Sequence, residues 1–135
     1  MNGLTAARIV AIGAALLAAL VFLSACGGGP QRYGHLNDGT ATASIPDLIA
    51  SPELHLGEEV AVRGLVVEVC RELGCWFQVM ESGRTLMVDL DAGRRLSLGA
   101  DARGHTARVE GTLVRQDGVL KILAKGVEIV PGTLL

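Results

Sequence analysis

Apolar residues recur at every second position from Glu59 to the end of the chain. This period of two predicts β-strands, each with one buried face. Turn-forming residues separate five such segments, so we expect five strands. Their alternating positions fall within residues 60–69, 75–80, 86–90, 107–113 and 120–129.

The connections between these strands carry recognisable turn signals. Residues 81–84 (Glu-Ser-Gly-Arg) predict a tight turn, and Asp117-Gly118 predicts a hairpin. The apolar phase slips at Gly64, which predicts a β-bulge or sharp bend in a long first strand, and Gly126 predicts another bulge. Residues 91–104 are rich in Gly, Arg, Asp and Ala and are expected to form a loop or short helical crossover.

A short helix is expected before the strands. The segment 44–47 (Ser-Ile-Pro-Asp) fits a helix start with Ser44 as the N-cap, and Pro52 and Gly57 limit the helix to one or two turns. Five strands and a non-hairpin connection between the third and fourth favour an all-β fold, a five-stranded OB-like Greek-key barrel over residues 44–135. Another small barrel or sandwich with the same number of strands is the alternative.

The start of the chain has the pattern of a secretory signal. Arg8 precedes an uncharged apolar run of 15 residues, 9–23, which is shorter than the roughly 20 residues of a membrane-spanning helix. Residues 23–26 (Leu-Ser-Ala-Cys) resemble the lipobox of bacterial lipoproteins. The resemblance implies that residues 1–25 are a lipoprotein signal peptide and that Cys26 is lipidated. A plain transmembrane anchor is the alternative.

Residues 26–43 contain mostly Gly, Pro, Asn, Asp and Thr and lack apolar periodicity, which predicts a flexible tether. Tyr33 and His35 are expected to be solvated residues of that tether. The lipid on Cys26 would join the domain to the cell membrane or outer membrane, facing the periplasm or exterior. Gly27, in place of Asp, favours outer-membrane sorting by resemblance to known lipoproteins.

Composition and charge exclude one class of partner. Without the signal peptide 110 residues remain, with 11 basic and 14 acidic residues and a formal charge of −3. Nucleic-acid binding needs a concentrated basic face or aromatic stacking platforms, and only 3% of the residues are aromatic. We therefore expect no nucleic-acid partner. The chain also lacks a nucleophile-elbow or phosphate-binding loop motif, so we expect no enzyme activity.

Two cysteines remain after lipidation, Cys70 and Cys75, and exported proteins occupy an oxidising compartment. They would flank a four-residue loop that joins the first two strands. Opposed residues closing a hairpin lie about 4.5–5.5 Å apart, within the usual Cα separation for a disulfide. A structural disulfide that fixes the register of the hairpin is the favoured interpretation.

Two alternatives for the cysteine pair stay open. Kept reduced, the thiols could bind copper or zinc, with Met80, Met87, His105 or His55 as additional ligands. Each of these four residues also has an ordinary role as barrel packing or exposed surface. A thiol-disulfide oxidoreductase is less favoured, because redox thiols normally lie at a helix N-terminus and Arg71 is the only obvious nearby cation.

Trp76 is a further candidate, as a binding platform. It follows Cys75 in a strand, so it points outward if Cys75 and Phe77 point inward. Exposed tryptophan is enriched at interfaces. The alternative is that the helix or the tether covers it.

Residues 69–76 (Val-Cys-Arg-Glu-Leu-Gly-Cys-Trp) resemble the Cys-x4-Cys-Trp motif of a family of small exported bacterial OB-like proteins of unknown function. The resemblance extends over about residues 47–130 and includes Pro52–Gly64 and Val109–Gly111. The chain departs from the family at residues 88–93, where an aromatic-rich segment is common. The resemblance implies the fold but no activity. The sequence therefore predicts a membrane-anchored lipoprotein of the cell envelope that acts as a non-enzymatic binding or structural module for an unidentified protein or small molecule.

Overall fold

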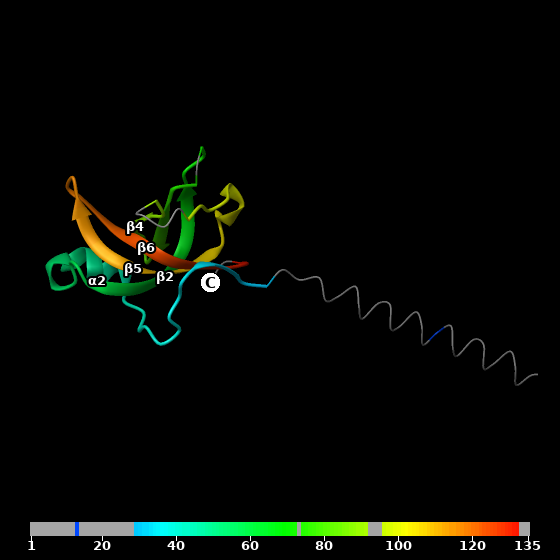
Figure 1. Cartoon of the computed structure of the whole chain (residues 1–135), viewed down its shortest axis with the longest axis horizontal. Coiled ribbons are helices and arrows are strands. Elements are labelled where there is room, and N and C mark those ends of the chain that lie inside the picture. Colours follow the sequence, from blue (N-terminus) through cyan, green and yellow to red (C-terminus); the bar gives the residue numbers. More distant parts are fainter. Residues whose placement is uncertain (1–12, 14–28, 73, 92–95, 133–135) are drawn as a thin grey trace, which may run out of the picture.

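The computed structural model describes Gly13 and residues 29–72, 74–91 and 96–132 (Figure 1). Cys26 and, apart from Gly13, the expected signal peptide lie outside the described residues. Across the described ranges, no helix has the length and apolarity needed to span a membrane.

The described chain is mostly β-structure. Its elements in chain order are β1 (Gln31–Gly34), α2 (Ile45–Ala50), the 3-10 helix η1 (Pro52–Leu54), β2 (Glu59–Val69), β3 (Trp76–Glu81), β4 (Arg84–Asp89), the 3-10 helix η2 (Ala100–Ala102), β5 (Thr106–Gln116) and β6 (Val119–Val130).

Five of the strands close into a barrel. Around the ring the order is β2-β3-β4-β6-β5, and β5 pairs with β2 to complete it. The pairing of β4 with β6 is parallel and the other pairings are antiparallel. The connection between β4 and β5 carries η2 (Figure 1). These features confirm the predicted all-β, OB-like Greek-key barrel with a short N-terminal helix.

The two predicted hairpin turns are present. Ser82 and Gly83 have φ angles of 50° and 75°, and Asp117 and Gly118 have φ angles of 51° and 78°. Positive φ at both central residues defines a type I′ turn, which matches the twist of the flanking strands. Both turns close two-residue loops in which the strands pair up to the turn.

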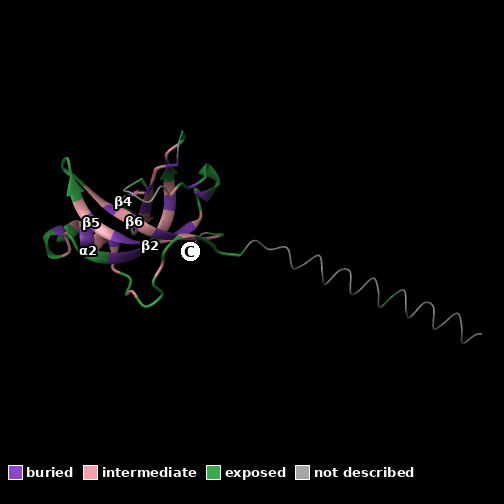
Figure 2. Ribbon diagram, viewed as in Figure 1, coloured by how far each residue is buried: buried purple, intermediate pink, exposed green. Residues whose placement is uncertain are grey.

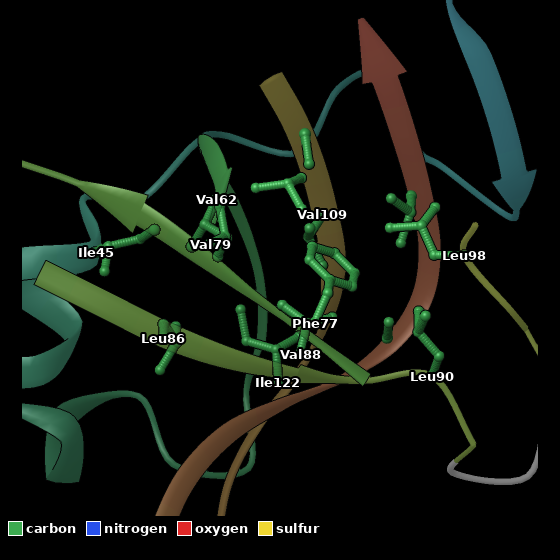
Figure 3. Packing of buried hydrophobic residues seen from close by; sticks show 14 of the residues in the cluster. Ile45, Val62, Phe77, Val79, Leu86, Val88, Leu90, Leu98, Val109 and Ile122 are labelled. Carbon is green, nitrogen blue, oxygen red and sulfur yellow. The ribbon is translucent and has the colours of Figure 1, made fainter. Parts of the chain in front are cut away.

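The core fills the interior of the barrel. Buried residues alternate with half-buried ones along the strands (Figure 2), as the sequence pattern predicts. Phe77 of β3 is fully buried and lies in the middle of the cluster, with Ile45 of α2 at one end and Leu98 at the other (Figure 3). Helix α2 therefore closes one end of the barrel.

The N-cap of α2 is the expected residue, but the hydrogen bond at the helix start comes from elsewhere. Ser44 is the N-cap residue, but its side chain makes no capping hydrogen bond. Instead, the Ile45 N–H donates to Oε2 of Glu81 at 2.7 Å. A carboxylate at the end of β3 thus satisfies the helix start, a long-range contact that a local motif cannot reveal.

The irregularity expected at Gly64 lies further along β2. Residue pairing between β2 and β3 shifts between Val66 and Glu68, so Val67 is the bulged residue. Gly64 is nevertheless special, because a Cβ there would lie 2.4 Å from the backbone oxygen of Met80. Close approach of β3, and not a bulge, explains this glycine.

The expected flexible tether is wrong for most of its length. Residues 31–43, which we call the strap, begin with β1, and β1 pairs antiparallel with β6. The His35 N–H donates to the backbone oxygen of Lys125 at 2.9 Å. Lys125 is the extra residue in a register shift between β5 and β6, which confirms a bulge beside Gly126. A Cβ on Gly126 would lie 2.1 Å from the oxygen of His35, so this glycine lets the strap cross β6.

A buried carboxylate holds the second half of the strap. Glu110 of β5 is fully buried, and its Oε2 accepts a hydrogen bond of 2.8 Å from the Asn37 N–H. Nη2 of Arg108 lies 2.7 Å from Oε1 of Glu110 as an ion pair without hydrogen-bond alignment. The same Nη2 lies 3.2 Å from the backbone oxygens of Asn37 and Thr40. The strap is therefore fixed by polar contacts, which the periodicity of apolar residues in the sequence does not predict.

Candidate functional site

The two cysteines lie at one end of the β2–β3 hairpin. Cys70 follows the last residue of β2, and Cys75 precedes the first residue of β3. The Cys70 N–H donates to the backbone oxygen of Trp76 at 2.9 Å, and the Gly74 N–H donates to that of Cys70 at 3.2 Å. The ladder therefore continues past the strand ends and brings the two sulfur atoms to 3.5 Å.

The connection between β4 and β5 supports this cysteine pair. The Leu90 N–H donates to the backbone oxygen of Cys75 at 2.8 Å, and the Leu98 N–H donates to that of Gly74 at 3.1 Å. Gly74 has a φ of 58°, and a Cβ on it would lie 2.2 Å from the backbone oxygen of Leu98. Leu90 and Leu98 are themselves buried in the core. The cysteines thus sit on a backbone anchored from two sides.

The chemistry of the pair follows from the contact between the sulfurs. The Cys75 thiol donates to Sγ of Cys70, and this hydrogen bond, followed by partial burial, raises the pKa of Cys75 above its ordinary value. A raised pKa keeps the thiol protonated near neutral pH, and the thiolate is the nucleophilic form. Because folding favours the protonated thiol, the reduced protein loses this stabilisation as pH rises through the raised pKa. The two sulfur atoms are placed to bond to each other, and the Cys75 thiol is held in its protonated form.

The structure does not bring the candidate methionine and histidine ligands to the cysteines. Met80 lies five residues beyond Cys75 along extended chain, about 16 Å at 3.3 Å per residue. Met87 is half-buried on the outer side of β4. His105 accepts a hydrogen bond from the Gly132 N–H through Nδ1 at 3.0 Å. His55 faces Glu58 just after η1, with its Nδ1 3.5 Å from Oε2.

No group of three or more His, Cys, Asp and Glu side chains comes together as a metal site within the described ranges. Among the described residues, the two thiols therefore meet without a histidine, carboxylate or third cysteine beside them.

Trp76 lies on the outside of the barrel, beside the cysteines. It is half-buried, whereas its neighbour Phe77 is fully buried, so the expected alternation holds. Trp76 pairs with Asp89 of β4, whose carboxylate accepts a hydrogen bond of 2.8 Å from Nζ of Lys121. We call the half-buried residues of this region the outer wall; they are Trp76, Gln78, Met87, Asp89 and Lys121.

Asp89 lies at the end of β4, on the same face as Met87 and in an ion pair with Lys121. The alternation of Leu86, Val88 and Leu90 was the available signal, because it puts residues 87 and 89 together on the opposite face.

Comparison with known proteins adds little to these observations. No family model matches the chain, and no curated protein matches it. Among solved structures, the hypothetical protein ygiW from E. coli aligns with 77% of this chain and 99% of its own, at 18% sequence identity and a TM-score of 0.47.

Proposed function

We propose that this protein is a lipoprotein of the cell envelope, in which the barrel serves as a non-enzymatic binding module. The lipobox-like residues 23–26 support the anchor. The observation that carries the binding role is the position of Trp76, half-buried on the outer wall directly beside the cysteine pair. In OB-type barrels, the face of the second and third barrel strands and the adjoining loops are the usual place for ligands. Here those strands are β3 and β4.

The proposal includes a disulfide between Cys70 and Cys75 in the exported protein. Sulfur atoms at 3.5 Å need a movement of about 1.5 Å to reach the 2.05 Å of a disulfide bond. Oxidising compartments favour that bond. By closing a short loop the disulfide would stabilise the domain by about 2 kcal/mol and hold Trp76 at a fixed position beside it.

Lipidation is tested by Cys26→Ser in the producing cell. Acyl transfer needs a thiol at this position, so we expect the variant to accumulate as an unprocessed precursor that incorporates no labelled fatty acid. Cys70→Ser is the matched control, because it removes another thiol and leaves residues 23–26 unchanged; it should be labelled normally. Normal labelling of Cys26→Ser would contradict the lipoprotein assignment.

The thiol state is tested by intact mass spectrometry of unreduced protein taken from the envelope, with metal analysis of the same sample. We expect a mass 2 Da below that of the dithiol form, and recovery of those 2 Da on reduction. Two thiols with one bound copper or zinc ion per chain would replace the disulfide by the metal-binding alternative. A mixture that exchanges with partner proteins as mixed disulfides would favour the oxidoreductase.

A further inference from the structure

A hollow of about 480 Å³ opens in the barrel wall next to the cysteine pair. It lies between the end of β2 and the connection that carries η2. Its lining residues are Val67, Glu68, Val69, Arg71, Ala100 and Arg103. We call it the arginine cavity.

The cavity exists because β2 is longer than its pairing with β5. That pairing ends at Leu65, opposite Thr106. Val66 then exchanges backbone hydrogen bonds with Gly104 and His105, at 2.8 and 2.9 Å. Beyond Val66, no strand of the described chain pairs with this side of β2. The bulge at Val67 falls at the same place. Bulges commonly occur beside binding sites, where they redirect side chains.

Two unpaired cations flank the cavity. Arg71 and Arg103 are exposed, and neither makes an ion pair or side-chain hydrogen bond within the described residues. Arg32, Arg108 and Arg115 have carboxylate partners, whereas Arg63 and Arg84 have none among the described residues but do not line this cavity. Guanidinium groups bind phosphate and carboxylate oxygens through paired hydrogen bonds.

The remaining lining residues shape what the cavity can accept. Val67 and Val69 give it an apolar side, which strengthens ionic contacts by reducing hydration. Glu68 is its one lining carboxylate. One negative charge against two positive ones favours a ligand group with a single charge, such as a phosphodiester, over a dianion.

We propose that the arginine cavity binds a phosphate group, with Arg71 and Arg103 as its ligands. The group can belong to a phospholipid headgroup or to a free phosphate. The lipid source rests on the proposed anchor. Gln31 is five residues after Cys26, a reach of at most about 18 Å. Gln31 also lines a small hollow with Ala102 of η2, so the anchored end of the chain and the arginine cavity share one end of the barrel.

The test uses the full chain in nanodiscs, because its apolar N-terminal segment stays in lipid there. Hydrogen exchange of backbone amides in residues 67–71 and 100–104 reports occupancy. The reference nanodiscs are of phosphatidylcholine, whose phosphodiester is balanced by its own choline cation. One arm adds inorganic phosphate at mildly acidic pH, where it is mainly the monoanion. The other arm replaces part of the phosphatidylcholine by phosphatidylglycerol, whose phosphodiester has no such cation. The variants are Arg71→Gln with Arg103→Gln, Glu68→Gln, and Arg84→Gln as the matched control. Arg84 is the exposed first residue of β4, at the end of the β3–β4 hairpin that lies away from Trp76.

We expect protection of both segments in at least one arm. In the double arginine variant, the protection factors of these amides should fall about tenfold or more. They should rise in Glu68→Gln and stay unchanged in Arg84→Gln. Protection by inorganic phosphate identifies the free anion as the source. Protection by phosphatidylglycerol alone identifies the headgroup.

No protection in either arm would overturn the proposal, and so would equal protection in the double arginine variant. Arg71→Lys with Arg103→Lys, which keeps the charge, should restore part of the binding and shows that loss in the glutamine variant is not misfolding. Nanodiscs supply headgroups whether or not Cys26 is acylated. A failure here is therefore separate from a failure of the lipidation test.

Discussion

Gly64 is constrained by close backbone approach and not by its backbone angle. Its φ is not in the positive range, so glycine is not needed for conformation. A Cβ there would nevertheless lie 2.4 Å from the oxygen of Met80 and 2.8 Å from Cγ2 of Val79. The sequence predicted that Gly64 matters but assigned the reason wrongly, because a slip in apolar phase cannot show which neighbouring strand approaches.

Gly64→Ala should therefore destabilise the domain even though alanine is the smallest change available. The new methyl group must push β3 away from β2 or shift Val79 within the core, a cost of about 1–3 kcal/mol. Thermal unfolding measures it. Gly39→Ala is the matched control, because the nearest atom to its Cβ would be the flexible side-chain oxygen of Asn37 at 3.4 Å. Equal midpoints for the two variants would show that β2 and β3 have room to separate.

At the scale of elements, the sequence predicted the barrel strands well and the strap not at all. Strands β2 to β6 follow from the alternation of apolar residues, since each has one face in the core. The strap has no such signal. It is polar and rich in glycine, and its order comes from the edge of β6 and from Glu110, about 70 residues away. Non-local polar contacts of this kind leave no periodicity in the segment they fix.

Glu110→Gln tests the hold of β5 on the strap. Glutamine keeps the shape and an acceptor for the Asn37 N–H but removes the charge that faces Arg108 and Lys125. We expect a loss of about 1.5–3 kcal/mol, the scale of hydrogen bonds to charged groups, and faster amide exchange in residues 37–42. Glu53→Gln is the control, because its pair with Arg115 is exposed and should change stability little. Unchanged exchange at residues 37–42 would mean that β1 alone holds the strap.

In the candidate site, too, features set by local rules could be predicted and features set by non-local contacts could not. The neighbouring cysteines and the outward Trp76 could be predicted, because hairpin pairing and strand alternation are local rules. The arginine cavity could not, because Arg71 and Arg103 are 32 positions apart and meet only where β2 outlasts its pairing with β5. Met80 shows the opposite case. It is near Cys75 in sequence, but the extended strand β3 places it at the other end of the hairpin.

At the scale of the whole molecule, the strap moves the beginning of the folded domain from the expected Ser44 to Gln31. Three sets of contacts cross the expected boundary: the β1–β6 ladder, the Asn37–Glu110 hydrogen bond, and the hydrogen bond of 2.7 Å from the Ala43 N–H to the backbone oxygen of Ala61. If Cys26 carries lipid, the barrel is then held within a few residues of the membrane, and a long flexible tether is absent.

This boundary can be tested with two soluble chains, one starting at residue 29 and one at residue 44. If the strap is part of the fold, the shorter chain loses its strand pairing and exposes Glu110 and the edge of β6. We expect it to be less stable by about 2 kcal/mol or more, which lowers the melting midpoint by about 8 °C or more for a domain of this size. Circular dichroism melts at matched concentration measure the difference. A chain starting at residue 31 is the control and should match the longer one, because its start keeps β1 complete. Equal midpoints for all three chains would return residues 31–43 to the role of a passive tether and would place the barrel farther from its anchor.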